Sequence, residues 1–202
     1  MQYSGVMLMK KSICGLLCIW VLMLMSPNAM AGCGAGTVLS FRFKAETYLL
    51  MADHRWLSQR DRGWSGFGGR CDGQPVEVAA ARETEEETKG FYRRGEILAR
   101  LDSSPKIRVG DFTTFFLEVD YVPAIVLNNQ ESFNHGVDHI ERGPYAWIPI
   151  SVIREAIAKR QSARMYIPGK YLPPDAQTDW LFEPFVISLM AAQKAGILPW
   201  AP

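Results

Sequence analysis

The sequence predicts a mixed α/β domain in which helices cover both faces of a β-sheet. Gly36 to Phe43 alternates polar and apolar residues as a strand does, and Thr113 to Val122 is rich in β-branched and aromatic residues. Between them, Pro75 to Lys89 is typical of a helix, with proline in the first turn, three consecutive alanines and Gly90 as a stop. Strands, helix, strands and helix in this order indicate one domain with a mixed sheet.

The remaining elements between residues 47 and 144 follow from shorter patterns. Thr47 to Met51 predicts a second strand that forms a hairpin with the first, and His54 to Gly63 is typical of a loop. Phe91 to Leu101 favours one strand or two short ones. Pro123 to Pro144 predicts a long polar loop, and loops of this length are usually functional or disordered.

The C-terminal third predicts two helices after a short apolar segment at Tyr145 to Pro149. Ser151 to Arg160 is amphipathic, with Ser151 as the expected N-terminal cap. Asp179 to Lys194 predicts a second helix, interrupted or started afresh at Pro184. We therefore expect a domain over residues 32–160 and a helical extension over 161–202 that packs on it.

The N-terminal segment resembles an export signal. Lys10 and Lys11 precede an apolar run, and Ala29-Met30-Ala31 gives the small residues that a signal peptidase reads. We expect cleavage after residue 31 and a periplasmic or secreted protein. Met30 to Cys33 also resembles a lipoprotein signal, in which Cys33 is acylated. We expect attachment to a membrane only if Cys33 is acylated in this way.

Two cysteines remain after removal of the signal, Cys33 and Cys71, in a compartment that permits disulfides. A disulfide between them, two free thiols, or an acylated Cys33 beside a lone Cys71 all remain open from the sequence. The chain has 202 residues and a net charge of +1, so no nucleic acid polymer is expected as a partner. No pattern indicates an oligomeric state.

Three acidic residues in the predicted helix carry the chemistry. Glu83, Glu86 and Glu87 stand at positions i, i+3 and i+4, so their carboxylates project from one face. Like charges at these spacings each cost about 0.2–0.5 kcal/mol, which Mg²⁺ or Mn²⁺ would offset by binding carboxylate oxygens. The alternative is a solvated acidic face on which Arg82 pairs with Glu85 or Glu86, and Lys89 pairs with Glu85.

The stretch from Gly68 to Gly90 resembles the Nudix box, the signature of the Nudix hydrolases. Gly68 is followed after five residues by Gln74, and seven residues later come Arg82-Glu83 and then Glu86-Glu87 in register. The resemblance extends over roughly residues 36–158. It departs from the family pattern at Gln74, where a glutamate is expected, at Thr84, where an aliphatic residue is expected, and at Lys89, where a glycine is expected.

The resemblance implies an α/β/α sandwich and water attack on a diphosphate joined to another group, in a nucleoside diphosphate derivative. It implies Glu86 and Glu87 as metal ligands, Glu83 as a ligand or the group that orients water, and Arg82 as a brace for the carboxylates. Gln74 is expected to weaken the local network, with Glu77 as a substitute. Because Lys89 replaces the closing glycine, we expect the helix to run one residue further.

Family members often use one more acidic residue from a later loop, and Glu131, Asp138 and Glu141 are candidates here. We favour Glu141 because it lies shortly before Trp147. A zinc site at His135 and His139 is disfavoured, since no third ligand stands at a recognisable spacing.

The leading hypothesis is an exported, metal-dependent pyrophosphohydrolase of the Nudix type. The alternative is a non-catalytic Nudix-fold protein that binds or senses such a ligand, and Gln74 and Lys89 favour it. No second motif selects a substrate among the small-molecule diphosphates.

Overall fold

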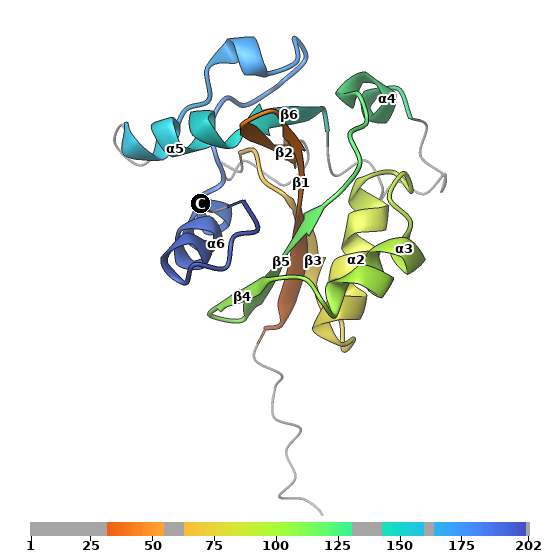
Figure 1. The fold of residues 1–202 in the computed structure, drawn as a ribbon. Coiled ribbons are helices and arrows are strands. Elements are labelled where there is room, and N and C mark those ends of the chain that lie inside the picture. Colours follow the sequence, from red (N-terminus) through yellow and green to blue (C-terminus); the bar gives the residue numbers. More distant parts are fainter. Residues whose placement is uncertain (1–31, 55–62, 131–142, 160–163, 201–202) are drawn as a thin grey trace, which may run out of the picture. The chain divides into compact units, whose positions relative to one another are not determined.

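The computed structural model describes residues 32–54, 63–130, 143–159 and 164–200. In these ranges a six-stranded sheet carries helices on both faces, as the sequence predicts (Figure 1). The strands are β1 (Gly34–Phe43), β2 (Glu46–Ala52), β3 (Phe67–Arg70), β4 (Lys106–Val109), β5 (Phe112–Glu118) and β6 (Tyr145–Pro149). The helices are α2 (Val76–Glu87), α3 (Arg94–Leu101), α4 (Ala124–Asn128), α5 (Ile150–Ala158) and α6 (Glu183–Lys194), with a 3₁₀ turn, η3, at Gly169–Tyr171.

Strand β1 organises the sheet, whose order is β4-β5-β1-β2-β6, with β3 also paired to β1. It runs parallel to β5 and antiparallel to β2 and β3. Its first half, Gly34 to Thr37, pairs with β3, and its second half, Leu39 to Phe43, pairs with β2. Two strands therefore share one edge of β1, and the short β3 is placed beside the segment where β1 begins.

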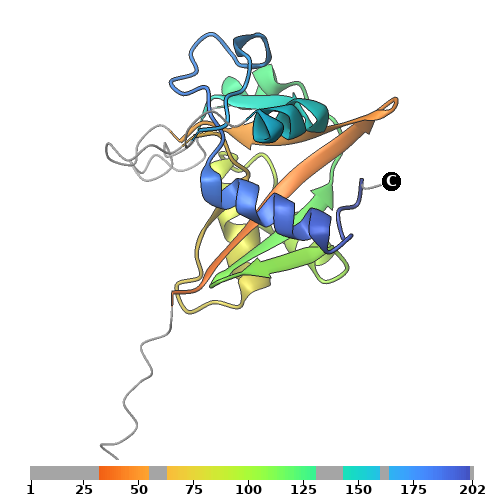
Figure 2. The same ribbon diagram turned by 90° about the vertical axis from the view of Figure 1, so that its left-hand side faces the viewer.

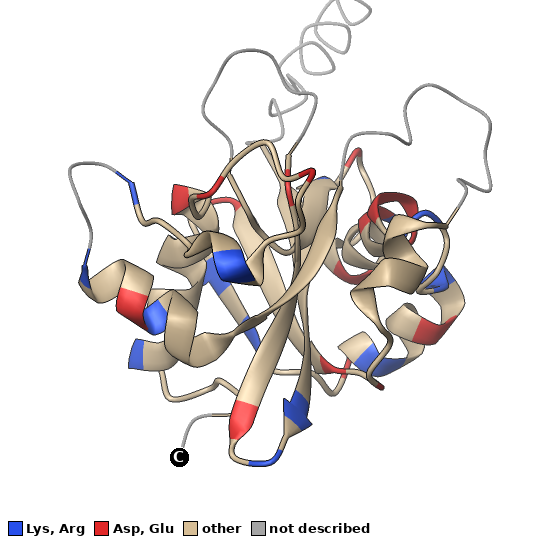
Figure 3. Ribbon diagram, turned by 90° about the horizontal axis from the view of Figure 1, so that it is seen from above, with Lys and Arg blue, Asp and Glu red and all other residues tan. Residues whose placement is uncertain are grey.

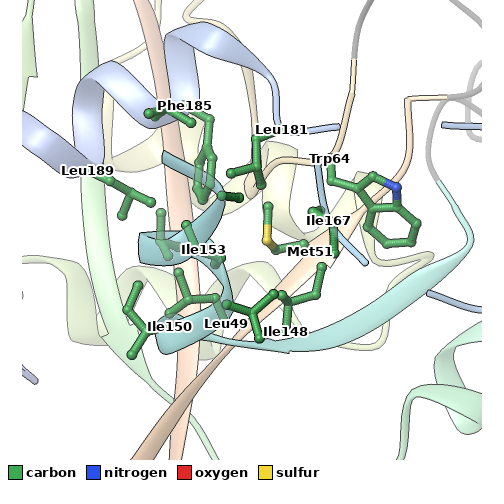
Figure 4. Close-up of a cluster of buried hydrophobic side chains, with 14 of the residues drawn as sticks. Leu49, Met51, Trp64, Ile148, Ile150, Ile153, Ile167, Leu181, Phe185 and Leu189 are labelled. Carbon is green, nitrogen blue, oxygen red and sulfur yellow. The ribbon is translucent and has the colours of Figure 1, made fainter. Parts of the chain in front are cut away.

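Each face of the sheet has its own apolar core. Leu39 and Leu50 point toward α2 and α3 with Phe115, whereas Leu49 and Met51 point toward α5 and α6. Figure 4 shows the second cluster, in which side chains of β2, β6 and the two C-terminal helices interlock. The alternation of neighbouring leucines between the two cores follows from the period of two along a strand.

The C-terminal segment is joined to the sheet by buried polar contacts. Asp53 is fully buried and accepts hydrogen bonds from the backbone N–H groups of Gln177 (2.8 Å) and Thr178 (3.0 Å) and from the Thr178 hydroxyl (2.7 Å). Trp64 pairs through its backbone with Trp180 and Phe182. These bonds lead the chain into α6, which crosses the sheet on the side away from α2 (Figures 1 and 2).

Three local predictions are wrong. Residues 94–101 form helix α3 rather than strands, because Ile97 and Leu101 lie on one face and are buried against α2 and β5. Ser151 does not cap α5; Pro149 stands at the N-cap, and the Ser151 hydroxyl donates instead to Glu46 (2.6 Å). The region from Pro123 contains a short helix, α4, rather than loop throughout.

Within the described ranges, no helix has the length and apolarity needed to cross a bilayer.

Candidate active site

Helix α2 holds the acidic residues and is packed closely on the sheet. Its alanines Ala79, Ala80 and Ala81 are fully buried, so the helix backbone approaches β1 and β3 without intervening bulk. Thr84 is also fully buried, and its hydroxyl lies 2.7 Å from that of Thr37 on β1. A threonine at an expected aliphatic position is accommodated because its polar atom has a partner across the helix–sheet contact.

The helix ends where the family glycine is expected, and the prediction that it runs one residue further is wrong. The N–H of Gly90 donates to the Glu85 carbonyl (2.7 Å) and that of Lys89 to the Glu86 carbonyl (3.1 Å). This pair of bonds is a Schellman motif. Lys89 itself takes the left-handed conformation, with φ of 55°. The backbone shape that glycine favours is therefore kept with a lysine in place.

Glu87 and Glu83 both point from α2 to the short strand β3. A Glu87 carboxylate oxygen accepts a hydrogen bond from the N–H of Gly68 (2.7 Å), and the side chain is almost fully buried. The carboxylate of Glu83 lies so close to Gly69 that a Cβ there would stand 2.5 Å from it. Glycine at position 69 is therefore required for the acid to reach the strand backbone. Glu86 is more exposed and lies beside Arg82.

Arg82 joins two of the acids and the preceding loop, as predicted for a brace. Its guanidinium lies 2.8 Å from Glu83 and 2.9 Å from Glu86, and it donates to the backbone carbonyl of Arg70 (2.7 Å). Burial lowers the pKa of Arg82, but the charges of Glu83 and Glu86 outweigh that effect and raise the pKa above its ordinary value. The guanidinium therefore stays charged between these two carboxylates.

Gln74 takes part in this network directly. Its side-chain carbonyl accepts a hydrogen bond from Arg82 Nε at 3.1 Å. Glu77, the expected substitute, does not join the network, because it pairs with Lys106 on β4 at 2.9 Å, and that partner lowers the pKa of Glu77. The amide thus retains the acceptor atom that the family glutamate would supply, without its charge.

The structure adds two groups that the sequence motif did not indicate. Tyr145 on β6 donates its hydroxyl to the Glu87 carbonyl (2.6 Å) and packs near Lys89, whose ammonium lies 5.7 Å from its ring centroid. The Gly68 N–H is the second, since it fixes the Glu87 carboxylate. The glycine-rich run was visible in the sequence, but the role of Tyr145 depends on a long-range contact that no local pattern records.

The candidate later-loop acids Glu131, Asp138 and Glu141, and the disfavoured zinc candidates His135 and His139, lie outside the described residues. Among the described residues, no three His, Cys, Asp or Glu side chains gather as a group that could hold a metal ion. The donor chemistry nevertheless fits a hard divalent cation, since Glu83, Glu86 and Glu87 all offer carboxylate oxygens from one helix, with Glu83 and Glu87 against β3 and Glu86 beside Arg82. Glycine at position 69 lets the Glu83 carboxylate occupy the space that a side chain there would fill.

A disulfide lies at one end of the site. Cys33, just before β1, is bonded to Cys71, just after β3, and the Cys71 N–H donates to the Cys33 carbonyl (2.9 Å). Of the alternatives left open by the sequence, the structure contains the disulfide. It joins the start of β1 to the loop that leads into α2.

The fold and this helix–strand arrangement define an α/β domain with an arginine-braced acidic helix. A family model of the NUDIX domain matches residues 34–166, well over half of the chain. The chain belongs to the Nudix family, and the predicted α/β/α architecture is confirmed. Membership supports a hydrolase of pyrophosphate-containing substrates, in a family that generally uses divalent metals. A comparison with curated proteins found no match.

Proposed function

We propose that this protein is an exported, metal-dependent pyrophosphohydrolase acting on a nucleoside diphosphate derivative. The observation that carries the proposal is the set of acids on α2, with Glu83 and Glu87 set against β3 and Glu86 held by Arg82. Each of these acids has a specific partner in the described residues, and their spacing matches the Nudix box noted in the sequence. On a solvated acidic face the carboxylates would point into water, whereas Glu87 is buried and accepts a hydrogen bond from the Gly68 N–H.

The proposed reaction is attack of water on one phosphorus of the diphosphate. A new P–O bond forms to the water oxygen, the bridging P–O bond breaks, and its electron pair leaves with the other phosphate; the water proton passes to a carboxylate. A bound Mg²⁺ or Mn²⁺ would polarise the phosphate oxygens and lower the pKa of the attacking water. Glu86 and Glu87 would hold the metal, and Glu83 would act as a further ligand or orient the water.

Arg82 is assigned a positioning role rather than a catalytic one. Its donors are directed to Glu83, Glu86, Gln74 and the Arg70 carbonyl, so they point into the network and not away from it. Glu141 remains the favoured additional carboxylate on the family resemblance.

The alternative function is a non-catalytic Nudix-fold binding or sensor protein. Gln74 and Lys89 are the observations that favour it, since both depart from the family pattern. Both departures leave the local geometry intact, because Gln74 still bonds to Arg82 and Lys89 still closes the helix. The intact acids therefore favour the enzyme.

Export is supported by the signal-like N-terminus and by the disulfide. Because the Cys33 sulfur is bonded to the Cys71 sulfur, it cannot also carry a lipid anchor. Among the described residues, basic and acidic positions are interspersed along the ribbon (Figure 3), which favours a small-molecule partner over a nucleic acid polymer. Mass spectrometry of the mature N-terminus tests the proposed export signal. A free Gly32 supports cleavage after residue 31, and a diacylglyceryl mass on Cys33 contradicts it.

The activity test is Mg²⁺- or Mn²⁺-dependent turnover of a panel of diphosphate compounds by the mature protein. Glu86→Gln and Glu87→Gln should each lower turnover by about 100-fold or more, because removal of a single charge-stabilising group commonly has this effect. Glu96→Gln, an acid on the neighbouring helix α3, is the matched control. If both variants keep the wild-type turnover, the assignment of Glu86 and Glu87 as metal ligands is wrong. If a diphosphate compound binds but none is turned over, the binding or sensor function is favoured.

A further inference from the structure

A cleft of about 720 Å³ lies against the opposite side of β3 from the acids. This volume lies within the range of roughly 300–1,000 Å³ typical of small-molecule sites. One side of the cleft is bare backbone, formed by glycines on β1 and β3. At Gly36 a Cβ would stand 2.2 Å from the Phe67 carbonyl oxygen, and at Gly68 2.7 Å from Gly36 Cα. Side chains are therefore excluded from this floor by the close pairing of the two strands.

The walls of the cleft are mainly apolar, and the two charged residues that line it, Arg70 and Asp111, have side chains that are 89% and 57% exposed. Phe112 on β5 and Ile187 on α6 line it while remaining 36% and 47% exposed, and Phe182 and Phe185 line it beside them. Exposed large apolar side chains that converge on a hollow mark a binding site more often than scattered ones do. Three of these four side chains come from the C-terminal segment, beyond residue 166, where the family match ends.

Three hydroxyl groups of residues that line the cleft, those of Thr37, Ser65 and Ser188, already have partners within the protein. Ser65 donates to the Gly66 carbonyl (2.8 Å) and lies 2.7 Å from His54 Nε2, while Ser188 donates to the Pro184 carbonyl (3.2 Å). The Thr37 hydroxyl points to the other face and bonds to Thr84. A ligand rich in hydroxyl groups would leave many of them without partners in such a cleft, which costs free energy.

One strand of backbone separates this cleft from the acids. Along β3, Gly68 faces the cleft and Gly69 faces the Glu83 carboxylate, while the Gly68 N–H holds Glu87. Among the described strands β3 pairs with β1 alone, so a ligand whose diphosphate lies at the acids can place its adjoining group in the cleft by passing around the other edge of β3.

We propose that the cleft binds a hydrocarbon substituent of the diphosphate, such as an alkyl or isoprenoid chain. This inference rests on the proposed hydrolysis of a diphosphate linkage and changes the expected substrate: the diphosphate carries a hydrocarbon group in place of a nucleoside or sugar. Helix α6 is then the element that sets specificity, because it supplies the apolar wall that faces the glycine floor.

The test compares farnesyl diphosphate, uridine diphosphate glucose and inorganic pyrophosphate as probes of the mature protein by calorimetry. We expect farnesyl diphosphate to bind at least tenfold more tightly than the other two. Ile187→Asp should weaken its binding by about tenfold or more, because a charge would face the buried chain. Met190→Asp is the matched control, since Met190 lies on the same helix with 53% exposure and does not line the cleft.

A second variant, Ile187→Trp, fills part of the cleft without adding charge and should weaken the binding of farnesyl diphosphate to the same extent. It keeps the test valid if Ile187→Asp has a folding defect. Thermal melts of all three variants accompany the binding data. Equal binding of farnesyl diphosphate and pyrophosphate, or equal effects at positions 187 and 190, would overturn the inference.

The two proposals fail in different ways. If Glu87-dependent turnover persists but no variant at Ile187 changes KM, the cleft assignment is wrong and the proposed activity stands. If farnesyl diphosphate binds in an Ile187-dependent manner but is never cleaved, the proposed hydrolysis is wrong and the cleft assignment stands.

Discussion

The disulfide allows the most quantitative prediction. Cys33 and Cys71 are 38 residues apart, and closing a loop of this length removes chain entropy worth about 4 kcal/mol from the unfolded state. Reduction should leave the native contacts in place, because the backbone bond from the Cys71 N–H to the Cys33 carbonyl does not involve sulfur. Nearly the whole effect should therefore reside in the unfolded chain.

The measurement is urea unfolding of the mature protein before and after reduction, followed by circular dichroism. With a slope of about 2 kcal/mol per molar urea, a loss of about 4 kcal/mol lowers the midpoint by about 2 M. The Cys33→Ala/Cys71→Ala double variant is the control: it should unfold like the reduced protein and ignore the reductant. If reduction lowers the free energy of unfolding by less than about 1 kcal/mol, the loop-entropy reasoning is refuted.

Two other substitutions test the site and its surroundings. Gly69→Ala should lower turnover at least tenfold, because the new Cβ would collide with the Glu83 carboxylate. Gly95→Ala in α3 is the control: nothing lies within 4 Å of the new Cβ, so activity should be kept and stability should rise by about 0.5–1 kcal/mol. Equal activity of the two variants would contradict the close approach of Glu83 to Gly69. Burial and the charge of Asp120 raise the pKa of Tyr92 to about 12, above the ordinary value of 10.0. The unfolded state therefore loses this proton first, and stability should fall by up to about 2–3 kcal/mol as pH rises from 10 to 12. Tyr92→Phe should remove this part of the alkaline loss in urea melts at successive pH values, and unchanged pH dependence would show that the burial effect is absent.

Long periodic segments were predictable from the sequence because their signals are local. The β1–β2 hairpin, helix α2 and strand β5 follow from alternation, capping and β-branched residues, and the structure contains each within a few residues of its expected bounds. The restart of the last helix at Pro184 also followed, since proline is tolerated in the first turn.

Helix α3 was missed because its pattern is ambiguous over eight residues. Ile97 and Leu101 are spaced as on a helix, but the preceding Phe91 and Tyr92 favour a strand, and only packing against α2 decides between them. Strand β4 was missed for a related reason: Lys106 to Val109 is short and half exposed, so it has little apolar signal of its own.

The site divides in the same way. The spacing of Glu83, Glu86 and Glu87 fixes which face of α2 they share, so their grouping was predictable. What each carboxylate contacts was not, because Gly68, Gly69 and Tyr145 are brought to the helix by strand pairing over long stretches of chain. Lys89 shows a further limit of the motif: the sequence predicts a longer helix there, but the residue takes the left-handed conformation that glycine favours, and the helix ends.

The substitution Gln74→Glu separates the two functional hypotheses. Arg82 already reaches the Gln74 side-chain oxygen at 3.1 Å, so the change adds charge but not a new contact, and a charge-assisted bond should add about 0.5–1 kcal/mol to stability. If the wild-type protein is the enzyme, turnover should change by less than about tenfold, because Glu83, Glu86 and Glu87 keep their partners. If turnover appears only in the variant, or rises by about 100-fold or more, the native amide has disabled the site and the protein is a binding protein. The comparison needs the same diphosphate panel for both chains, with Gln74→Ala as the variant that lacks any acceptor for Arg82.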